Sequence, residues 1–418
     1  MDTWQHPLEQ PEPALERQPR ALPSCVLDAL QSAELPCLLY RPSVLRRRIQ
    51  TIMEVFPHYY YPMKCNPCRR LVETAVVEGA GLDVCSPPEL DLALAVGTDP
   101  ALISYTGLGL CVDLMRRLAK SGAMVNLDSI RDLEEWVQSC SGYPVGLRLK
   151  AGPQRSYRAK FGIAVEHFDT TARMLRSTGT GLRGIHVHFG HGGRSGAQVA
   201  AALMDTLVPV LERLKDLVAE LEYVNLGGGW PVLYGDAQLV QPKDVADSLH
   251  AGLLAKLKSV GFSGQIAVEP GEFAVADCGY WAAQVVATKD SFECDHRSGS
   301  GWEQTRETHG RDQQRSEEMA ALAVLDTTTP IPSAAIPYPV HVLRSVNGRL
   351  VEVRGERSQP YRVVGITNSP FDTIRKRVLL PPLARGDVLV MGRTGAYLRS
   401  LIGRFHLRAP PAEYVLET

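Results

Sequence analysis

Short apolar runs alternate with longer amphipathic ones over most of this chain. The short runs have the length and composition of β-strands, and the longer ones place apolar residues near helical spacing. The predicted strands are residues 55–61, 102–105, 124–127, 145–149, 184–188, 223–226 and 265–268. The predicted helices between them are residues 88–96, 112–121, 129–139, 167–177, 195–218 and 245–260. This alternation over about 250 residues predicts parallel strands, and an (α/β)8 TIM-like barrel fits it best.

The pattern changes after residue 288. Residues 291–318 are highly polar and rich in Gly, Ser and Arg, which indicates a surface loop or an insertion. The β-type runs beyond them predict a mostly antiparallel C-terminal β-domain. Its predicted strands are residues 321–325, 340–344, 350–353, 361–365 and 387–391. The predicted domains are an N-terminal segment (1–36), the barrel (37–288), the insertion (289–320) and the β-domain (321–418). The N-terminal segment is ambiguous and is a candidate for one more strand of the β-domain.

Composition narrows the class of protein. The chain has 418 residues, 44% of them hydrophobic, which is enough for a sizeable core. Its net charge of −1 gives no reason to expect nucleic acid or a membrane surface as a partner. Nine scattered cysteines fit a reduced protein better than a secreted disulfide framework. Because neither a signal peptide nor an apolar run of about 20 residues is present, we expect a cytoplasmic location.

Lys64 is the first candidate for chemistry. It follows the aromatic run at residues 59–61, at the end of a predicted strand. A partly desolvated lysine amine forms Schiff bases with carbonyls, including that of pyridoxal phosphate. Most lysines are solvated surface charges, however, so the motifs downstream decide between the two interpretations.

Two motifs place acids and imidazoles near strand ends. Asp83 and Glu89 flank a strand–turn–helix, where an acid either serves the site or caps the helix. His186 and His188 point to one face of a strand, and His191 follows closely. These histidines fit metal ligation, stacking on a planar cofactor, or simple packing, and the motif alone leaves all three open.

Three further motifs suit a phosphorylated pyridine. A triplet of glycines follows a strand and can turn backbone N–H groups toward a phosphate; it consists of Gly227, Gly228 and Gly229. Glu269 ends the last barrel strand, where a carboxylate can keep a pyridine nitrogen protonated. Near the C-terminus, the phenol of Tyr397 can reach a phosphate oxygen.

Taken in this order and spacing, the motifs resemble those of one family, the alanine-racemase-fold decarboxylases that use pyridoxal phosphate. The resemblance is to the diaminopimelate, ornithine and carboxynorspermidine decarboxylase type, and it spans roughly residues 38–410. It implies that Lys64 carries the cofactor as a Schiff base and that a substrate amine displaces it. It also implies head-to-tail homodimers, whose sites lie between one barrel and the partner's β-domain.

The resemblance also implies a role for each motif. His188 would stack on the cofactor ring, and Glu269 would pair with its nitrogen. The phosphate would lie near His191 and be bound by the glycine triplet with help from Tyr397. Asp83 and Glu89 would support the Lys64 side of the ring. No metal is expected.

Two departures from the family bear on the substrate and the last step. The family usually has a cysteine in the loop at residues 365–372, where this chain has Asn368, and an amide is no proton donor at neutral pH. Asn368, Ser369 and Asp372 of this loop are candidate substrate contacts. Glu272 stands where an arginine is common, and an acid there favours a cationic group on the substrate.

We therefore predict a pyridoxal phosphate-dependent decarboxylase of an amino acid, or of an amino-acid conjugate, with a second amine. Asn368 keeps open an oxidative deaminase coupled to decarboxylation. The sequence is also compatible with a racemase of the same fold, a non-catalytic regulatory homologue and a metal-dependent barrel hydrolase.

Overall fold

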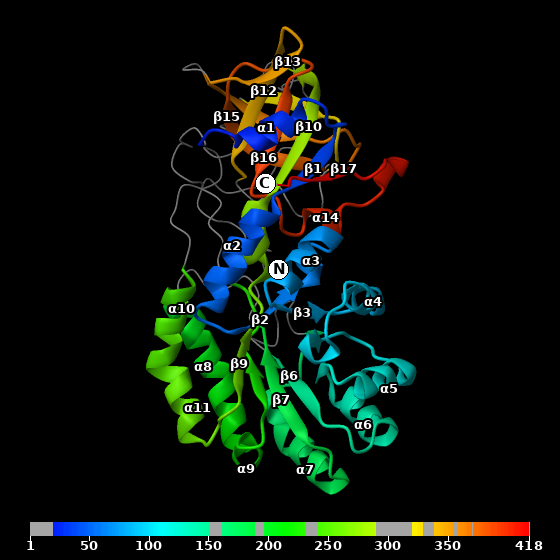
Figure 1. Cartoon of the computed structure of the whole chain (residues 1–418), viewed down its shortest axis with the longest axis vertical. Helices are drawn as coiled ribbons and strands as arrows, with labels where there is room; N and C mark the ends of the chain where they lie inside the picture. The colour runs from blue at the N-terminus through cyan, green and yellow to red at the C-terminus, as the bar shows by residue number, and fades with distance from the viewer. Residues whose placement is uncertain are drawn as a thin grey trace, which may run out of the picture. The chain divides into compact units, whose positions relative to one another are not determined.

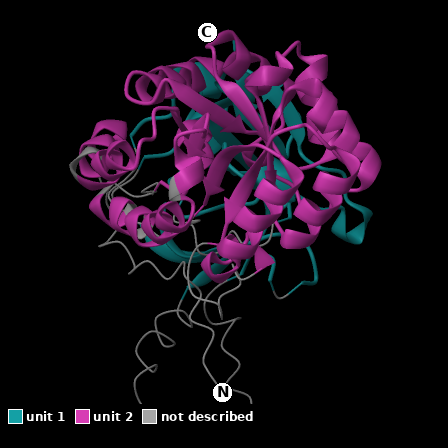
Figure 2. Ribbon diagram, turned by 90° about the horizontal axis from the view of Figure 1, so that it is seen from below, with its two compact units in different colours: residues 1–41, 233–237, 277–418 teal, residues 42–232, 238–276 magenta. Residues whose placement is uncertain are grey.

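The computed structural model describes residues 20–150, 160–188, 196–230, 241–289, 320–328, 338–354, 358–369 and 371–417. Two compact units make up the chain (Figure 2). One comprises residues 42–232 and 238–276, and the other residues 1–41, 233–237 and 277–418.

Eight parallel strands close into a barrel in the first unit, and helices surround them (Figure 2). The strands are β2 (His58–Pro62), β3 (Gly81–Val84), β4 (Ile103–Tyr105), β5 (Met124–Leu127), β6 (Val145–Leu149), β7 (Leu182–Val187), β8 (Tyr223–Asn225) and β9 (Gln265–Val268). They pair in sequence order, and β9 returns to β2. The predicted barrel is therefore confirmed.

The helices of this unit follow the strands along the chain. They are α2 (Pro42–Met53), α3 (Arg69–Val77), α4 (Pro87–Ala95), α5 (Val112–Ser121), α6 (Ile130–Ser139), α7 (Phe168–Thr178), α8 (Gly196–Arg213), α9 (Lys215–Val218), α10 (Pro242–Leu249), α11 (Ala255–Ser259) and α12 (Gly271–Val275). The single helix predicted at 195–218 is two helices, and the one predicted at 245–260 contains the π-helical turn η5 (His250–Leu254). Apolar spacing reports which face is buried, and it does not show where the backbone hydrogen bonds change.

A small buried cluster joins four strands of the barrel. Tyr60, Met124, Tyr223 and Ala267 form a buried cluster. A side chain at Gly184 would overlap the Tyr223 ring, so glycine at this position makes room for it. The Tyr223 hydroxyl donates to Oδ1 of Asn126 at 2.7 Å, so a polar side chain borders this cluster.

The second unit contains a nine-stranded sheet in the order β13-β12-β16-β10-β11-β14-β15, with β1 beside β10 and β17 beside β1 (Figure 1). Its strands are β1 (Cys37–Tyr40), β10 (Gly279–Lys289), β11 (Ala321–Leu325), β12 (Val340–Val346), β13 (Arg349–Glu352), β14 (Gln359–Val364), β15 (Thr373–Leu380), β16 (Val388–Gly392) and β17 (Ala412–Val415). All pairs are antiparallel except β1 with β17 and β11 with β14. The mostly antiparallel β-domain is thus confirmed.

Three elements differ from their predicted places. β1 and all but the last residue of β10 lie within the predicted barrel range 37–288, yet both strands belong to the sheet of the second unit. β1 is fully buried, and periodicity cannot distinguish such a strand from a barrel strand. The described part of the N-terminal segment forms a helix, α1 (Ser24–Leu30), in place of the candidate strand. The insertion at 291–318 lies outside the described residues.

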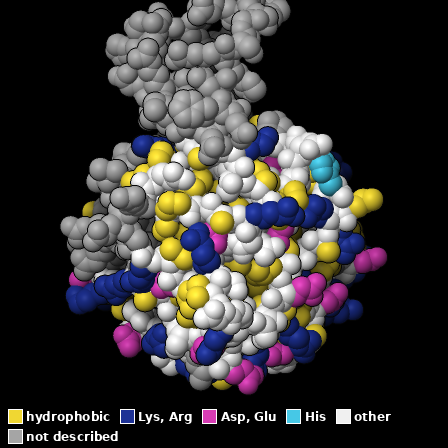
Figure 3. Space-filling model, turned by 90° about the horizontal axis from the view of Figure 1, so that it is seen from above, with side chains coloured by type: hydrophobic (Ala, Val, Ile, Leu, Met, Phe, Trp, Pro, Cys, Tyr) yellow, Lys and Arg dark blue, Asp and Glu magenta, His cyan; other side chains and the backbone are white. Residues whose placement is uncertain are grey.

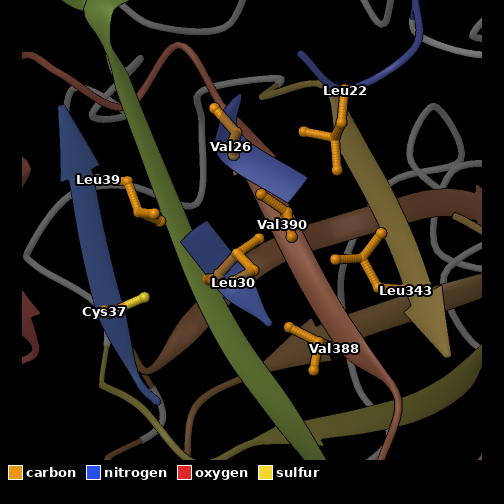
Figure 4. Close-up of a cluster of buried hydrophobic side chains, with 9 residues drawn as sticks. Leu22, Val26, Leu30, Cys37, Leu39, Leu343, Val388 and Val390 are labelled. Atoms are coloured by element: carbon orange, nitrogen blue, oxygen red, sulfur yellow. The ribbon is translucent and has the colours of Figure 1, made fainter. Parts of the chain in front are cut away.

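The helix α1 packs on the sheet through apolar side chains (Figure 4). Val26 and Leu30 of the helix join a buried cluster with Cys37 and Leu39 of β1 and Val390 of β16. These side chains are at most 2% exposed, which explains why the helix is held against the sheet.

Charges of both signs are interspersed over the described part of the face in Figure 3, with apolar patches between them. Among the described residues, no helix combines the length and apolar character that crossing a membrane requires. The expected cytoplasmic location stays a prediction.

Candidate active site

The predicted barrel residues lie at the carboxyl ends of different strands. Lys64 belongs to the short helix η1 (Met63–Cys65), which follows β2, and Asp83 lies in β3. His188 follows β7, and Glu269 follows β9. Because the carboxyl ends of parallel barrel strands meet on one rim, the fold gathers these side chains there. Barrel enzymes build their active sites on this rim.

Lys64 forms an ion pair with Asp83. Its Nζ lies 2.6 Å from Oδ2 of Asp83, which is 1% exposed, whereas 42% of the Lys64 side chain is exposed. Burial lowers the pKa of Lys64, but the charges of Asp83 and Glu269 outweigh it and hold the pKa well above its usual range. Burial and the Glu269 charge raise the pKa of Asp83. The amine must lose a proton before it can attack a carbonyl, and Asp83 is placed to accept that proton.

Glu269 is a buried carboxylate with three polar neighbours in the described part of the chain. Its Oε1 accepts hydrogen bonds from Asn225 Nδ2 at 2.5 Å and Ser104 Oγ at 3.4 Å. Its Oε2 lies 3.2 Å from Nε2 of His186. Burial would raise the pKa of Glu269, but His186, Lys64 and Asn225 lower it to about 2. The group is therefore anionic at neutral pH and suited to pair with a protonated ring nitrogen.

His188 is oriented by the glycine triplet. The N–H of Gly228 donates to its Nδ1 at 3.1 Å, which leaves the proton of a neutral imidazole on Nε2. Burial and the charges of Lys64 and His186 lower the pKa of His188 well below its usual range. The side chain is therefore a flat, neutral ring that can stack on a planar group.

The glycine turn is shaped by close backbone contacts. Gly227 and Gly229 have φ values of 65° and 85°, a conformation that favours glycine. A side chain at Gly227 would overlap the carbonyl of Val187, and one at Gly228 would overlap the carbonyl of Glu269. The turn thus needs glycine for steric reasons, and its use for a phosphate stays a prediction.

The remaining predicted residues of the barrel fall into separate groups. Ser86 caps α4, because its Oγ accepts the N–H of Glu89 at 3.4 Å, and Oε2 of Glu89 accepts the N–H of Cys85 just before the helix at 2.7 Å. Glu272 lies in the first turn of α12 and is half-buried. His191 lies outside the described residues. In the described part of the chain, no group of three or more His, Cys, Asp or Glu is arranged to bind a metal ion.

The predicted residues of the second unit lie in loops. Tyr397 precedes α14 (Leu398–Leu401) with φ 62°, an uncommon conformation for a residue other than glycine. Asn368 is exposed and Ser369 is half-buried. Asp372 is 5% exposed, and its Oδ2 accepts from the N–H and the hydroxyl of Thr367 at 2.9 and 2.5 Å. Asp372 therefore organises its own loop, and its contact with substrate stays a prediction.

Sequence reasoning misses the residues that surround Glu269. It suggests His186 only as a possible metal ligand, a stacking ring or a packed side chain, and it gives Asn225 and Ser104 no role. The register pairs His186 with Asn225 and Asn225 with Ala267, two residues before Glu269. Two features of the sequence could have indicated these neighbours of Glu269. His186 and His188 alternate along one strand and so share a face, and Asn225 directly precedes the glycine turn after β8.

Comparison with known proteins decides the family. The family described as "Pyridoxal-dependent decarboxylase, pyridoxal binding domain" matches residues 43–276. The chain belongs to this family. The diaminopimelate decarboxylase of Methanothermobacter thermautotrophicus is 26% identical over 375 residues, which cover 85% of this chain and 79% of the relative. Antizyme inhibitor 2 of Xenopus laevis is 23% identical over 376 residues, which cover 85% of this chain and 75% of the relative.

Solved structures agree in fold. The Helicobacter pylori diaminopimelate decarboxylase complexed with L-lysine superposes with a TM-score of 0.75 and 20% identity, covering 93% of each chain. The arginine decarboxylase of Paramecium bursaria Chlorella virus, bound to agmatine, superposes with a TM-score of 0.74 and 18% identity. The match covers 94% of this chain and 99% of the viral one. The protein is a pyridoxal phosphate-dependent lyase of the amino-acid decarboxylase type, as the sequence resemblance implied.

The described residues fit this cofactor. The rim offers an amine for the cofactor aldehyde and a buried carboxylate for its ring nitrogen. Oδ1 of Asp83 is buried and has no hydrogen-bond partner among the described residues. A buried polar atom without a partner is costly, so a polar group of a ligand would relieve it.

Proposed function

We propose that the protein decarboxylates an amino acid that carries a second amine, with pyridoxal phosphate linked to Lys64. The arrangement that supports this most is the ion pair on the barrel rim, in which Nζ of Lys64 lies 2.6 Å from Oδ2 of the buried Asp83. When bound, the cofactor supplies an electron sink for breaking the bond between Cα and the carboxylate.

Each rim residue then has a task. Asp83 takes a proton from Lys64, so that the amine can hold the cofactor aldehyde. Glu269 stays anionic and pairs with the ring nitrogen, because its pKa is about 2. The neutral imidazole of His188 covers one face of the ring.

We further assign the phosphate of the cofactor to the glycine triplet, Tyr397 and His191. Asn368, Ser369, Asp372 and Glu272 are the proposed substrate contacts. In a homodimer with shared sites, the loop at 365–372 would serve the partner's barrel.

The covalent link is tested with borohydride and mass spectrometry. The purified protein should absorb in the visible range of a lysine-bound cofactor, and reduction should fix the cofactor mass on the peptide that contains Lys64. Lys64→Ala should lose both the absorbance and turnover. Cofactor mass on another lysine, or full turnover by Lys64→Ala, would contradict the assignment.

The substrate class rests on Glu272. An acid at this position attracts a distal amine and repels a distal carboxylate. Release of CO2 from lysine and ornithine should therefore exceed release from meso-diaminopimelate, which carries both groups. Glu272→Arg should reverse the order, with Glu272→Gln as the neutral control. If the wild type and Glu272→Arg each release CO2 equally from the three substrates, Glu272 does not determine the substrate class.

Asn368 favours one second function, a decarboxylation-coupled oxidative deaminase. Its side chain is exposed and has no acidic proton to donate to a carbanion. The two outcomes differ in product, since a simple decarboxylase releases an amine and the oxidative enzyme consumes O2 and releases an aldehyde and ammonia. Asn368→Cys should raise the yield of amine in either case, with Asn368→Ala as its control.

The shared site is tested by mixing subunits. Lys64→Ala and an Asn368→Ala, Ser369→Ala variant should each be impaired. If the sites are shared, refolding them together should restore up to about a quarter of wild-type activity, because half of the random dimers contain one intact site of two. Absence of recovery, in a mixture that forms heterodimers, would count against shared sites.

A further inference from the structure

Glu269 is the only acidic side chain that the proposed function assigns to the cofactor ring nitrogen, so its orientation matters. An ionised carboxylate has about four acceptor positions, two on each oxygen. Among the described residues, Oε1 uses both of its positions, for Asn225 and Ser104, whereas Oε2 has one hydrogen-bond contact, with His186. A ring N–H that approaches the carboxylate is therefore received at Oε2.

The amide of Asn225 can take one orientation only. Its Oδ1 accepts the backbone N–H of Gly227 at 2.9 Å, and a backbone N–H is always a donor. Nδ2 must therefore face Oε1 of Glu269. The N–H of Glu269 also donates to the carbonyl of Gly227 at 2.8 Å. Asn225 thus ties the carboxylate to the glycine turn.

The imidazole of His186 has one polar task in the described structure. His186 is 2% exposed, and its Nδ1 is buried with no hydrogen-bond partner among the described residues. Glu269 is ionised and only accepts, so Nε2 of His186 carries the proton between them. An apolar side chain would fill this place without an unsatisfied nitrogen, so packing does not explain a histidine here.

We propose that His186 and Asn225 are positioning residues that clamp the Glu269 carboxylate, one donor on each oxygen, and leave one lone pair of Oε2 for the ring nitrogen of the cofactor. The inference rests on the proposed pairing of Glu269 with that nitrogen. Neither residue touches the reacting atoms; both act through Glu269.

The test compares pyridoxal phosphate with its 1-deaza analogue, in which carbon replaces the ring nitrogen. The ratio of their dissociation constants, measured by reconstituting stripped protein, isolates the contact at the ring nitrogen. His186→Asn shortens the side chain, so its amide no longer reaches Oε2. We expect this variant to reduce the wild-type preference for pyridoxal phosphate about tenfold, as expected for a lost hydrogen bond to a charged group.

Two control variants separate positioning from packing. His186→Gln keeps an amide donor near the Nε2 position and should retain most of the preference. His341→Asn disrupts a part-buried histidine–glutamate pair in the second unit, where Nδ1 of His341 lies 2.8 Å from Glu352 Oε1, and should leave the preference unchanged. The absorbance of the bound cofactor should shift in His186→Asn and not in His341→Asn.

The outcomes distinguish the two levels of the proposal. A wild-type protein that binds both cofactors equally would refute the role of Glu269 and with it the proposed site. A wild-type preference that His186→Asn leaves intact would overturn the clamp alone. If His186→Asn gives no cooperative thermal transition, Asn225→Ser takes its place, because a serine hydroxyl is too short to reach Oε1. The clamp predicts the same loss of preference for it, and an intact preference would overturn the proposal.

Discussion

Replacing Asp83 by Asn should lower the pKa of Lys64 markedly. The Lys64 Nζ lies 2.6 Å from the Asp83 carboxylate. At this distance, Coulomb's law gives about 6 kcal/mol at an effective dielectric constant near 20 and about 1.6 kcal/mol in water. Because 42% of the Lys64 side chain is exposed while Asp83 is 1% exposed, solvent screens the pair only in part, and the interaction lies between these two values. The Lys64 amine should therefore lose its proton at a clearly lower pH in Asp83→Asn than in the wild type.

The pKa can be measured on stripped protein by reductive methylation with ¹³C-formaldehyde and NMR titration. Lys64→Arg identifies the Lys64 resonance by its loss. Lys243 and Asp247 are the matched control pair, since their N···O distance is also 2.6 Å while both side chains are exposed. Asp247→Asn should move the pKa of Lys243 much less, because water screens that pair. If Asp83→Asn moves Lys64 no further than Asp247→Asn moves Lys243, burial of Asp83 does not govern the amine.

Three further predictions concern stability. Because the Glu269 pKa is depressed to about 2, its carboxylate adds stability that is present above the unfolded-state pKa and lost as pH falls through the folded-state one. The stability difference between wild type and Glu269→Gln in urea titrations should thus shrink from about pH 5 to pH 2, and a constant difference would contradict this. Gly184→Ala should destabilise the barrel by about 1 to 3 kcal/mol through overlap with Tyr223, and the Tm in calorimetry should fall by several degrees. Gly252→Ala is the control, because a Cβ there would have ordinary contacts. Equal Tm values for the two variants would contradict the packing argument. Asp372→Asn should lower the free energy of unfolding by about 1 to 3 kcal/mol and speed hydrogen exchange at the Thr367 amide. Asp113→Asn, at an exposed position, is the control and should change neither. Unchanged exchange in Asp372→Asn would show that another group orders the loop.

The sequence was sufficient for the barrel because a β/α alternation has few compact solutions. It was insufficient where a strand is buried on both faces, because such a strand has no alternation of apolar and polar residues. The sequence of the fully buried β1 cannot be distinguished from that of a barrel strand, and its pairing with β10 and β17 shows that it belongs to the sheet. The helix α1 is short and was not expected, because its apolar residues become meaningful only against the sheet that they cover (Figure 4).

The same limit applies to the candidate site. The sequence indicates Lys64 and Glu269 because a lysine and an acid at strand ends each suggest chemistry by themselves. The structure places both after strands of the barrel, and their roles stay a prediction. His186 and Asn225 could not be predicted in this way, because their importance comes from the register of β7, β8 and β9, which brings them beside Glu269. A single sequence shows the direction of each side chain along its own strand, and it does not show which residue of the next strand lies opposite.

Under the proposed function, the two buried acids at the rim would let one site both exchange a proton and hold a permanent charge. Burial and the neighbouring Glu269 charge raise the pKa of Asp83, whose Oδ1 has no hydrogen-bond partner in the described structure. Glu269 is equally buried, but His186, Lys64 and Asn225 lower its pKa to about 2. Pairs of acids whose surroundings drive their pKa values apart are a signature of divided acid–base roles. Asp83 is therefore the acid suited to take and return the proton of Lys64, and Glu269 the one suited to remain charged throughout.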